Sequence, residues 1–305
     1  MKKAHVLAVL LVSGLVACGA PKPPPTVAEL TEEAAKGSEE AARELIVKLG
    51  EGASRDDRAL AYKGLVENGA KFGQLITAAL TDKDPARREH ALALAANLRL
   101  PGTFEAAKEA LADPSFTRPH AAAWALGELQ DERAIPLLAD AMVRFGPGFS
   151  AREAARAISR YGKKAAGPLV ERYPRMDGEV KSYAIRILGE MRAPEGRPVI
   201  IAALKDPKYR ADAVWAVGAN GRIGEPVDLV PYLGDSDPRV RAEACRAAGV
   251  MVVRETAPTL DRMRAKDPDM VVREWAARGL GLLTDTPEKY LAKDGSWKEP
   301  DQLYH

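Results

Sequence analysis

A five-residue motif ending in a small residue recurs about every thirty positions, and this repetition limits the possible folds more than any other feature. We call the last residue of each copy its marker position. Clear copies end at Gly127, Gly189, Gly218, Gly249 and Gly281, and weaker copies end at Val66, Asn97 and Ser159. Successive markers are 29 to 32 residues apart. A period near thirty residues, sustained over eight copies, indicates stacked units that bury their apolar faces against their neighbours.

Each copy reads as two helices. In the copy that ends at Gly249, Asp237 supplies an N-cap and Pro238 fits the first turn, where a missing N–H costs nothing. At about 100° per residue, Val240, Ala244, Ala247 and Met251 fall on one apolar stripe. A preceding helix is expected over residues 224–233. The same dipeptide lies upstream of other markers, at Asp84-Pro85, Asp113-Pro114, Asp206-Pro207 and Asp267-Pro268.

No segment shows sustained alternation of apolar and polar residues, so no sheet is expected. The aromatic share of 6% also fits a β-sandwich or barrel poorly. The sequence therefore predicts an all-α fold, an α-solenoid of about eight helical pairs over residues 38–283. Residues 284–305 lie beyond the last marker, and we expect them to form a tail or a cap.

The unit resembles the HEAT repeat, in particular the short kind of about thirty residues named after the phycobilisome lyases. The pattern Asp-x-Asp-Pro-x-x-Arg at residues 82–88 and 235–241 carries this resemblance, which extends over about residues 38–283. The resemblance implies an armadillo-like superhelix whose second helices line the concave surface. It also implies a ladder of Asp and Arg between adjacent repeats, with matching spacing at Asp82/Arg88, Asp235/Arg241 and Asp267/Arg273.

The first residues have the layout of an export signal. Lys2 and Lys3 precede an apolar run that is too short to span a bilayer. The run ends in Leu15-Val16-Ala17-Cys18, which resembles the lipobox of bacterial lipoproteins. That resemblance implies cleavage of a signal peptide, residues 1–17, and acylation of Cys18. The other interpretation is an ordinary signal peptide in which Cys18 is incidental.

Residues 18–37 are expected to hold the lipidated cysteine, a proline-rich spacer and an N-terminal cap. The lipid would attach the chain to a membrane, facing the periplasm, because several acyl chains anchor durably where one does not. In enterobacteria an Asp after the cysteine tends to retain lipoproteins in the inner membrane. Gly19 at that position therefore favours the outer membrane.

Composition and motifs argue against several function classes. Lys and Arg number 45 against 43 Asp and Glu, so no global basic face is available for nucleic acid. Neither a phosphate-binding loop nor a nucleophile motif occurs, and we expect no enzyme and no cofactor. His90 and His120 lie too far apart for joint metal coordination, and Cys245 reads as a small residue at a helix contact.

The residues three positions before the markers form the one candidate site. This column reads Lys63, Leu94, Trp124, Arg156, Arg186, Trp215, Arg246 and Arg278. We call its last six members, from Trp124 to Arg278, the Arg/Trp row. On the concave surface the row would offer the residue types that dominate binding hot spots. The alternative is structural: the tryptophans fill gaps between helices, and the arginines pair with acids such as Glu153 and Glu243.

These features predict a membrane-anchored scaffold or adaptor of the cell envelope that binds a protein partner without catalysis. One alternative is a binder of an anionic cell-envelope polymer, held by the Arg/Trp row. Another is a lyase-like or chaperone accessory that delivers a cofactor to a client. Binding of a polymer would weaken steeply with salt, whereas a protein partner would tolerate it.

Overall fold

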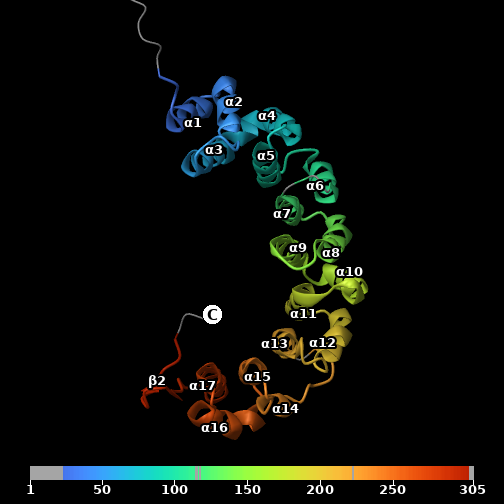
Figure 1. The fold of residues 1–305 in the computed structure, drawn as a ribbon, viewed down its shortest axis with the longest axis vertical. Coiled ribbons are helices and arrows are strands. Elements are labelled where there is room, and N and C mark those ends of the chain that lie inside the picture. The colour runs from blue at the N-terminus through green and yellow to red at the C-terminus, as the bar shows by residue number, and fades with distance from the viewer. Residues whose placement is uncertain (1–22, 114–115, 117, 222, 302–305) are drawn as a thin grey trace, which may run out of the picture.

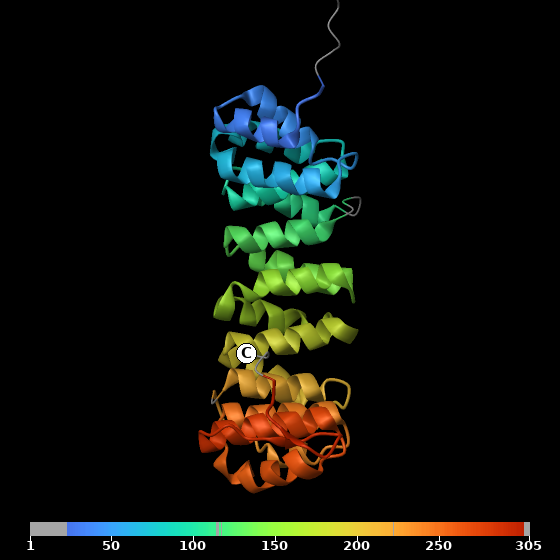
Figure 2. The same ribbon diagram turned by 90° about the vertical axis from the view of Figure 1, so that its left-hand side faces the viewer.

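A computed structural model describes residues 23–113, 116, 118–221 and 223–301. In this part of the chain the helices form eight antiparallel pairs stacked into a crescent, with one further helix, α1 (Val27–Ala35), at the N-terminal end (Figure 1). Seen from the side, the pairs lie as successive layers along the long axis (Figure 2). The all-α solenoid predicted from the sequence is confirmed.

The first helices of the pairs lie on the convex side of the crescent (Figure 1). They are α2 (Glu39–Val47), α4 (Gly73–Ala78), α6 (Thr103–Ala112), α8 (Ala134–Phe145), α10 (Ala166–Arg172), α12 (Arg197–Ala203), α14 (Val230–Leu233) and α16 (Ala257–Lys266). Short 3-10 segments extend several of them: η1 (Gly69–Phe72), η2 (Ala79–Thr81), η3 (Gly162–Ala165), η4 (Tyr173–Arg175), η5 (Pro194–Gly196) and η6 (Arg254–Thr256).

The second helices lie side by side along the concave side (Figure 1). They are α3 (Arg55–Asn68), α5 (Pro85–Asn97), α7 (Pro119–Leu129), α9 (Phe149–Ser159), α11 (Gly178–Met191), α13 (Arg210–Asn220), α15 (Pro238–Val250) and α17 (Met270–Thr284). The expected Asp-Pro start holds for α15, where the Asp237 side chain accepts a hydrogen bond from the Arg239 N–H.

The marker glycines allow neighbouring second helices to approach closely. A Cβ added at Gly189 would lie 2.7 Å from the Ala216 Cα, and one added at Gly249 would lie 2.7 Å from the Gly279 Cα. Each contacted residue lies two positions before the next marker. The motif therefore recurs about every thirty residues because each second helix packs closely against the next one. This contact requires a small residue on each of the two helices.

Arginines tie adjacent repeats together in the C-terminal half. The Arg241 guanidinium donates to both carboxylate oxygens of Asp267 in the next repeat, each at 2.9 Å, and to the backbone carbonyl of Asp235 in its own. Arg210 pairs with the Asp235 carboxylate one repeat on, at 3.0 Å. The Asp and Arg ladder implied by the HEAT resemblance is thus present between these repeats.

Both ends of the stack are covered. Helix α1 starts with a capping box between Thr26 and Glu29, and it buries Val27 and Leu30 against the first pair. After α17, residues 285–301 fold back over the last pair, where the Arg264 guanidinium donates to the Lys289 carbonyl at 2.7 Å. Polar end caps of this kind keep the apolar faces of terminal repeats away from water.

A short strand pair lies outside the otherwise helical fold, and one helix expectation was wrong. Tyr290–Leu291 (β1) and Trp297–Lys298 (β2) form a two-residue antiparallel pair, although no sheet was expected. The helix expected over residues 224–233 is limited to α14, because Gly224 has a φ of 75° and Pro226 lacks an N–H and constrains the residue before it. None of the helices in the described part of the chain is both long and apolar enough to cross a membrane.

Candidate functional site

The Arg/Trp row lies on the second helices, but its members differ in exposure. Arg156 on α9 is 68% exposed, whereas the Arg246 side chain on α15 is only 18% exposed. Trp124, Arg186, Trp215 and Arg278 are half-buried. The two earlier members of the same column are not part of the row. Leu94 is fully buried, and Lys63 forms an ion pair with Glu67.

A stack of two guanidinium groups on one indole dominates the C-terminal half of the row. The guanidinium carbons of Arg186 and Arg246 each lie 5.0 Å from the Trp215 ring centroid, within cation–π range. Arg246 also donates to the backbone carbonyl of Trp215 at 2.9 Å. Arg186 comes from α11, Trp215 from α13 and Arg246 from α15. The stack therefore joins three successive repeats.

Carboxylates neutralise the arginines of this stack. Arg186 Nε donates to Asp212 Oδ1 at 2.6 Å, and Arg246 Nε donates to Glu243 Oε2 at 3.1 Å. Burial raises the pKa of the Glu243 carboxyl above its ordinary value, against the opposing effect of the two arginines. The stack is therefore an ion-paired cluster that holds repeats together, and much of its positive charge is compensated locally.

The two remaining arginines of the row are also paired. Arg156 contacts Glu153 at 2.7 Å, and Arg278 contacts Glu274 at 2.5 Å while it donates to the Asp301 carbonyl. The pairing with acids that the sequence suggested for Arg156 and Arg246 is thus present. That the row binds a partner stays a prediction.

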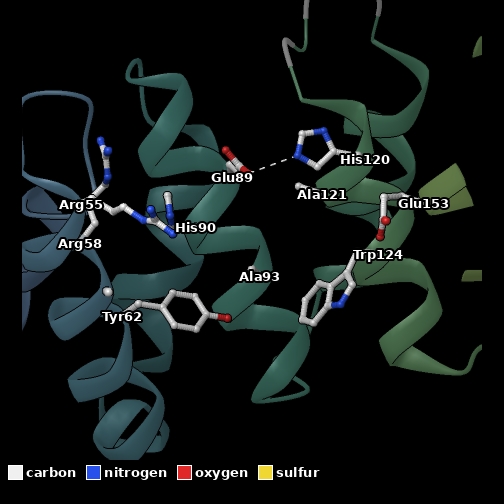
Figure 3. Close-up of a pocket in the computed structure, with 11 residues that line it drawn as sticks. Arg55, Arg58, Tyr62, Glu89, His90, Ala93, His120, Ala121, Trp124 and Glu153 are labelled. Carbon is white, nitrogen blue, oxygen red and sulfur yellow. Dashed lines mark ion pairs between the residues drawn. The ribbon is translucent and has the colours of Figure 1, made fainter. Parts of the chain in front are cut away.

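A pocket of about 570 Å³ opens on the concave surface in the N-terminal half (Figure 3). Four successive second helices contribute to it, α3, α5, α7 and α9, and its wall is largely apolar. The lining residues are Arg55, Arg58, Ala59, Tyr62, Glu89, His90, Ala93, His120, Ala121, Trp124 and Glu153. Trp124 is the member of the Arg/Trp row that lines this pocket.

Hydrogen bonds and ion pairs fix the polar side chains between α5 and α7. Glu89 contacts His120 Nε2 at 3.6 Å (Figure 3). It also contacts Arg118, at 2.7 Å. Burial alone would raise the pKa of Glu89, but the hydrogen bond to His120 and the charge of Arg118 hold it below its usual value. The Glu89 carboxylate is therefore an ionised, already paired group.

The side chains of α3 and α5 on the other side of the pocket are also in contact. The Tyr62 hydroxyl accepts a hydrogen bond from Asn97 at 2.6 Å, and its ring meets the His90 ring edge-on, with centroids 6.1 Å apart. His90 Nδ1 lies 2.7 Å from the carbonyl of Ala86. These contacts hold the tyrosine and the histidine as parts of a preformed wall.

Arg55 and Arg58 differ from the arginines of the row. Within the described residues neither forms an ion pair, and Arg58 donates only to the backbone carbonyl of Gly50, at 3.3 Å. Arg55 is exposed and Arg58 half-exposed. Two cations without carboxylate partners thus lie beside an aromatic wall.

The sequence analysis missed most of this pocket. It followed the column three residues before the markers, whereas Tyr62 and Ala93, which line the pocket, lie four residues before theirs. His90 and His120 both lie seven residues before their markers, and the sequence analysis considered them only as metal ligands. No group of three or more His, Cys, Asp or Glu side chains in the described ranges is placed to hold a metal ion.

Cys245 lies in neither the Arg/Trp row nor the pocket. Cys245 on α15 is fully buried, and burial raises the pKa of its thiol far above the ordinary value. It lies at the contact between α15 and α17, as a small residue there should. Cys18 lies outside the described residues.

Solved structures with a similar fold extend over most of the chain. The Escherichia coli protein YibA aligns over 88% of this chain and 100% of its own, with a TM-score of 0.53 and 17% identity. A chain from the structure of Kap95p with RanGDP aligns over 85% of this chain, with a TM-score of 0.59 and 12% identity. One from the Kap95–Nup1 complex gives a TM-score of 0.58, 11% identity and 85% coverage of this chain. This chain covers 43% of each of these two longer chains.

Family models settle the type of repeat. The model for HEAT repeats matches residues 73–159, 209–281 and 226–302, together more than half of the chain. The model for the PBS lyase HEAT-like repeat matches residues 180–206. A comparison with curated proteins returns no match. With its paired helices, its Asp and Arg ladder and these matches, the chain belongs to the HEAT-repeat family.

Proposed function

We propose that this protein is a lipid-anchored, periplasm-facing scaffold that binds a protein partner on its concave surface. The observation that carries the proposal is the pocket spanning α3 to α9, with half-buried Tyr62 and Trp124 in its wall and two arginines, exposed Arg55 and half-exposed Arg58, at its edge. Tyr, Trp and Arg are the residue types most enriched in the energetic centres of protein interfaces. A chain of similar fold occurs in the structure of Kap95p with RanGDP, which offers a precedent for this fold in a protein complex.

The anchor in this proposal is Cys18, which carries the acyl chains and becomes the N-terminal residue when residues 1–17 are removed. Seven residues, 19–25, separate Cys18 from Thr26, the N-cap of α1. Fully extended, the chain from Cys18 to Thr26 would span at most roughly 30 Å. The lipid would fix the protein to a membrane, with the outer membrane favoured, while the proline-rich spacer holds the solenoid clear of the lipid headgroups.

The ion pairs favour a protein over a polyanion as the partner. A polyanion needs a long track of available cations, but the arginines of the Arg/Trp row are paired with Glu153, Asp212, Glu243 and Glu274. We nominate no residue for catalysis or cofactor delivery. The titratable groups between α5 and α7 already form ion pairs with one another.

The anchor is tested by substitution of Cys18. Metabolic labelling with a radioactive fatty acid should mark the wild-type protein and leave Cys18→Ser unlabelled, with the variant moving from the membrane to the soluble fraction. An unlabelled wild-type chain would overturn the anchor and leave the binding proposal intact.

The binding surface is tested by crosslinking pull-down from membranes. The concave variant is Arg152→Glu/Arg156→Glu, two exposed positions on α9. The control is Arg43→Glu/Arg262→Glu, two exposed positions on the convex helices α2 and α16, with the same change in charge. The partner should be lost from the concave variant and kept by the control. Retention by both, with helical circular dichroism unchanged, would contradict the proposal.

A further inference from the structure

The arginines and carboxylates that line the pocket are not paired with one another. Its two acids, Glu89 and Glu153, are each held by cations of the protein, Arg118 and Arg156 respectively, both at 2.7 Å. Arg55 and Arg58 have no such carboxylate within the described residues. The pocket therefore offers two available guanidinium groups, and its own carboxylates do not neutralise them.

The other side of the pocket is suited to an apolar group. Trp124 on α7 and Tyr62 on α3 lie on opposite sides of Ala93, with Ala121 beside them (Figure 3). A volume of about 570 Å³ lies in the usual range for sites that enclose a small ligand or several side chains.

An exposed phenylalanine extends this apolar surface beyond the pocket. Phe149, the first residue of α9, is 55% exposed and packs edge-on against the ring of His120, with centroids 4.9 Å apart. A large apolar side chain exposed beside a pocket is typical of a surface that a partner covers.

From this arrangement we propose that the pocket binds an acidic segment of a protein, in which a carboxylate lies close to a bulky apolar side chain. Arg55 and Arg58 hold the carboxylate, and the apolar side chain packs between Tyr62 and Trp124 over Ala93. This inference rests on the proposed function, since it names the chemistry of the partner at the same concave surface.

The chemistry of the guanidinium groups and of the aromatic wall determines what the pocket can bind. Guanidinium groups bind carboxylates through paired, charge-assisted hydrogen bonds, and aromatic walls bind apolar groups at little entropic cost because they are already held in place. A uniform polyanion fits less well, because it would leave the aromatic wall without a partner.

The test uses the Cys18→Ser chain and a display library of random dodecapeptides. We expect the selected peptides to combine Asp or Glu with Leu, Ile, Phe, Tyr or Trp within a few positions. Replacing their acids by amides, or their large apolar residues by Ser, should each weaken binding about tenfold or more, as measured by fluorescence anisotropy.

Variants then locate the bound peptides. Arg55→Gln/Arg58→Gln should weaken binding about tenfold or more, whereas Arg43→Gln/Arg262→Gln, with the same change in net charge, should bind as the wild type does. Arg55→Gln alone keeps the test valid if the double variant is unstable, because Arg55 is exposed and forms no ion pair within the described residues, so folding does not depend on it. Arg55→Lys/Arg58→Lys should retain part of the affinity.

Several results would overturn the inference. They are selection of peptides without acids, failure to select any peptide, binding unaffected by Arg55→Gln/Arg58→Gln, and displacement of the peptides by inorganic polyphosphate without any need for an apolar group. Failure of the proposed function is distinguishable from these. If a cellular partner is lost from the α9 variant but not from Arg55→Gln/Arg58→Gln, the scaffold proposal stands and the pocket inference fails.

Discussion

Replacing Gly189 by Ala tests the packing that makes the repeat possible. Gly189 lies on α11, and the added Cβ would be 2.7 Å from the Cα, 2.8 Å from the Cβ and 3.0 Å from the carbonyl oxygen of Ala216 on α13. Two of these three atoms belong to the backbone, which no rotamer change can move away. The two helices must therefore separate, and the contact between their repeats must loosen.

Two effects of opposite sign set the magnitude. Inserting a methyl group into a packed core typically costs about 1–3 kcal/mol, and replacing Gly by Ala within a helix returns roughly 0.5–1 kcal/mol. We therefore expect a net loss of about 1–2 kcal/mol in the free energy of unfolding. Gly167 on α10 is the matched control, because a Cβ there meets nothing within 4 Å. Its change to Ala should leave stability unchanged or raise it by up to roughly 0.5–1 kcal/mol.

Urea unfolding followed by far-UV circular dichroism gives both values, and tryptophan fluorescence, to which Trp215 on the adjacent helix contributes, gives a second probe of the same transition. The Gly189→Ala midpoint should fall and the Gly167→Ala midpoint should not. If Gly189→Ala is as stable as the wild type, or if both variants change alike, close packing at the marker positions does not explain the repeat.

Three further predictions concern single groups. The Cys245 thiol, fully buried and with its pKa raised by burial, should stay unreactive toward a thiol reagent in the Cys18→Ser protein and react once urea unfolds it; rapid labelling of the native state would contradict its burial. Arg241→Ala should lower the free energy of unfolding by roughly 3–5 kcal/mol, because it leaves the buried Asp267 carboxylate without its bidentate partner; a loss below about 1 kcal/mol in urea unfolding would show that the ladder is dispensable. The Arg239 side chain donates a hydrogen bond to Asp237 and lowers the pKa of that carboxyl below 3.8. The Asp237 carboxylate therefore stabilises the fold fully above pH 3.8, and this contribution is lost as the pH falls through the folded-state pKa. Asp237→Asn should flatten the acid side of the plot of stability against pH, and an unchanged slope would contradict this.

The solenoid could be predicted because each repeat is specified by residues close together in the sequence. Asp237 and Pro238 define the start of α15 within a few residues, and the marker glycines repeat at the spacing of the helices they bring together. Where local signals were weak, the prediction was less accurate. α14 is short because Pro226 and the backbone of Gly224 interrupt the expected helix, and the pair formed by β1 and β2 is too short to produce a sequence pattern.

The pocket was harder to predict because it depends on how neighbouring second helices are rotated. A rotation of one residue, about 100°, decides whether position 62 or 63 faces the concave side, and it is Tyr62 that lines the pocket. Similarly, the sequence places arginines in the row, but it leaves open whether a carboxylate from another repeat reaches them. For Arg186 the partner, Asp212, comes from the next repeat.

Site-specific photocrosslinking in cells tests the central claim, that the concave surface binds a protein, most directly. A photoreactive amino acid would replace Arg156, exposed on the concave helix α9, and in a second strain Arg262, exposed on the convex helix α16. We predict a discrete crosslinked protein from position 156 that is absent or much weaker from position 262. A partner captured equally at both positions, or from position 262 alone, would contradict the assignment of the concave surface as the binding site.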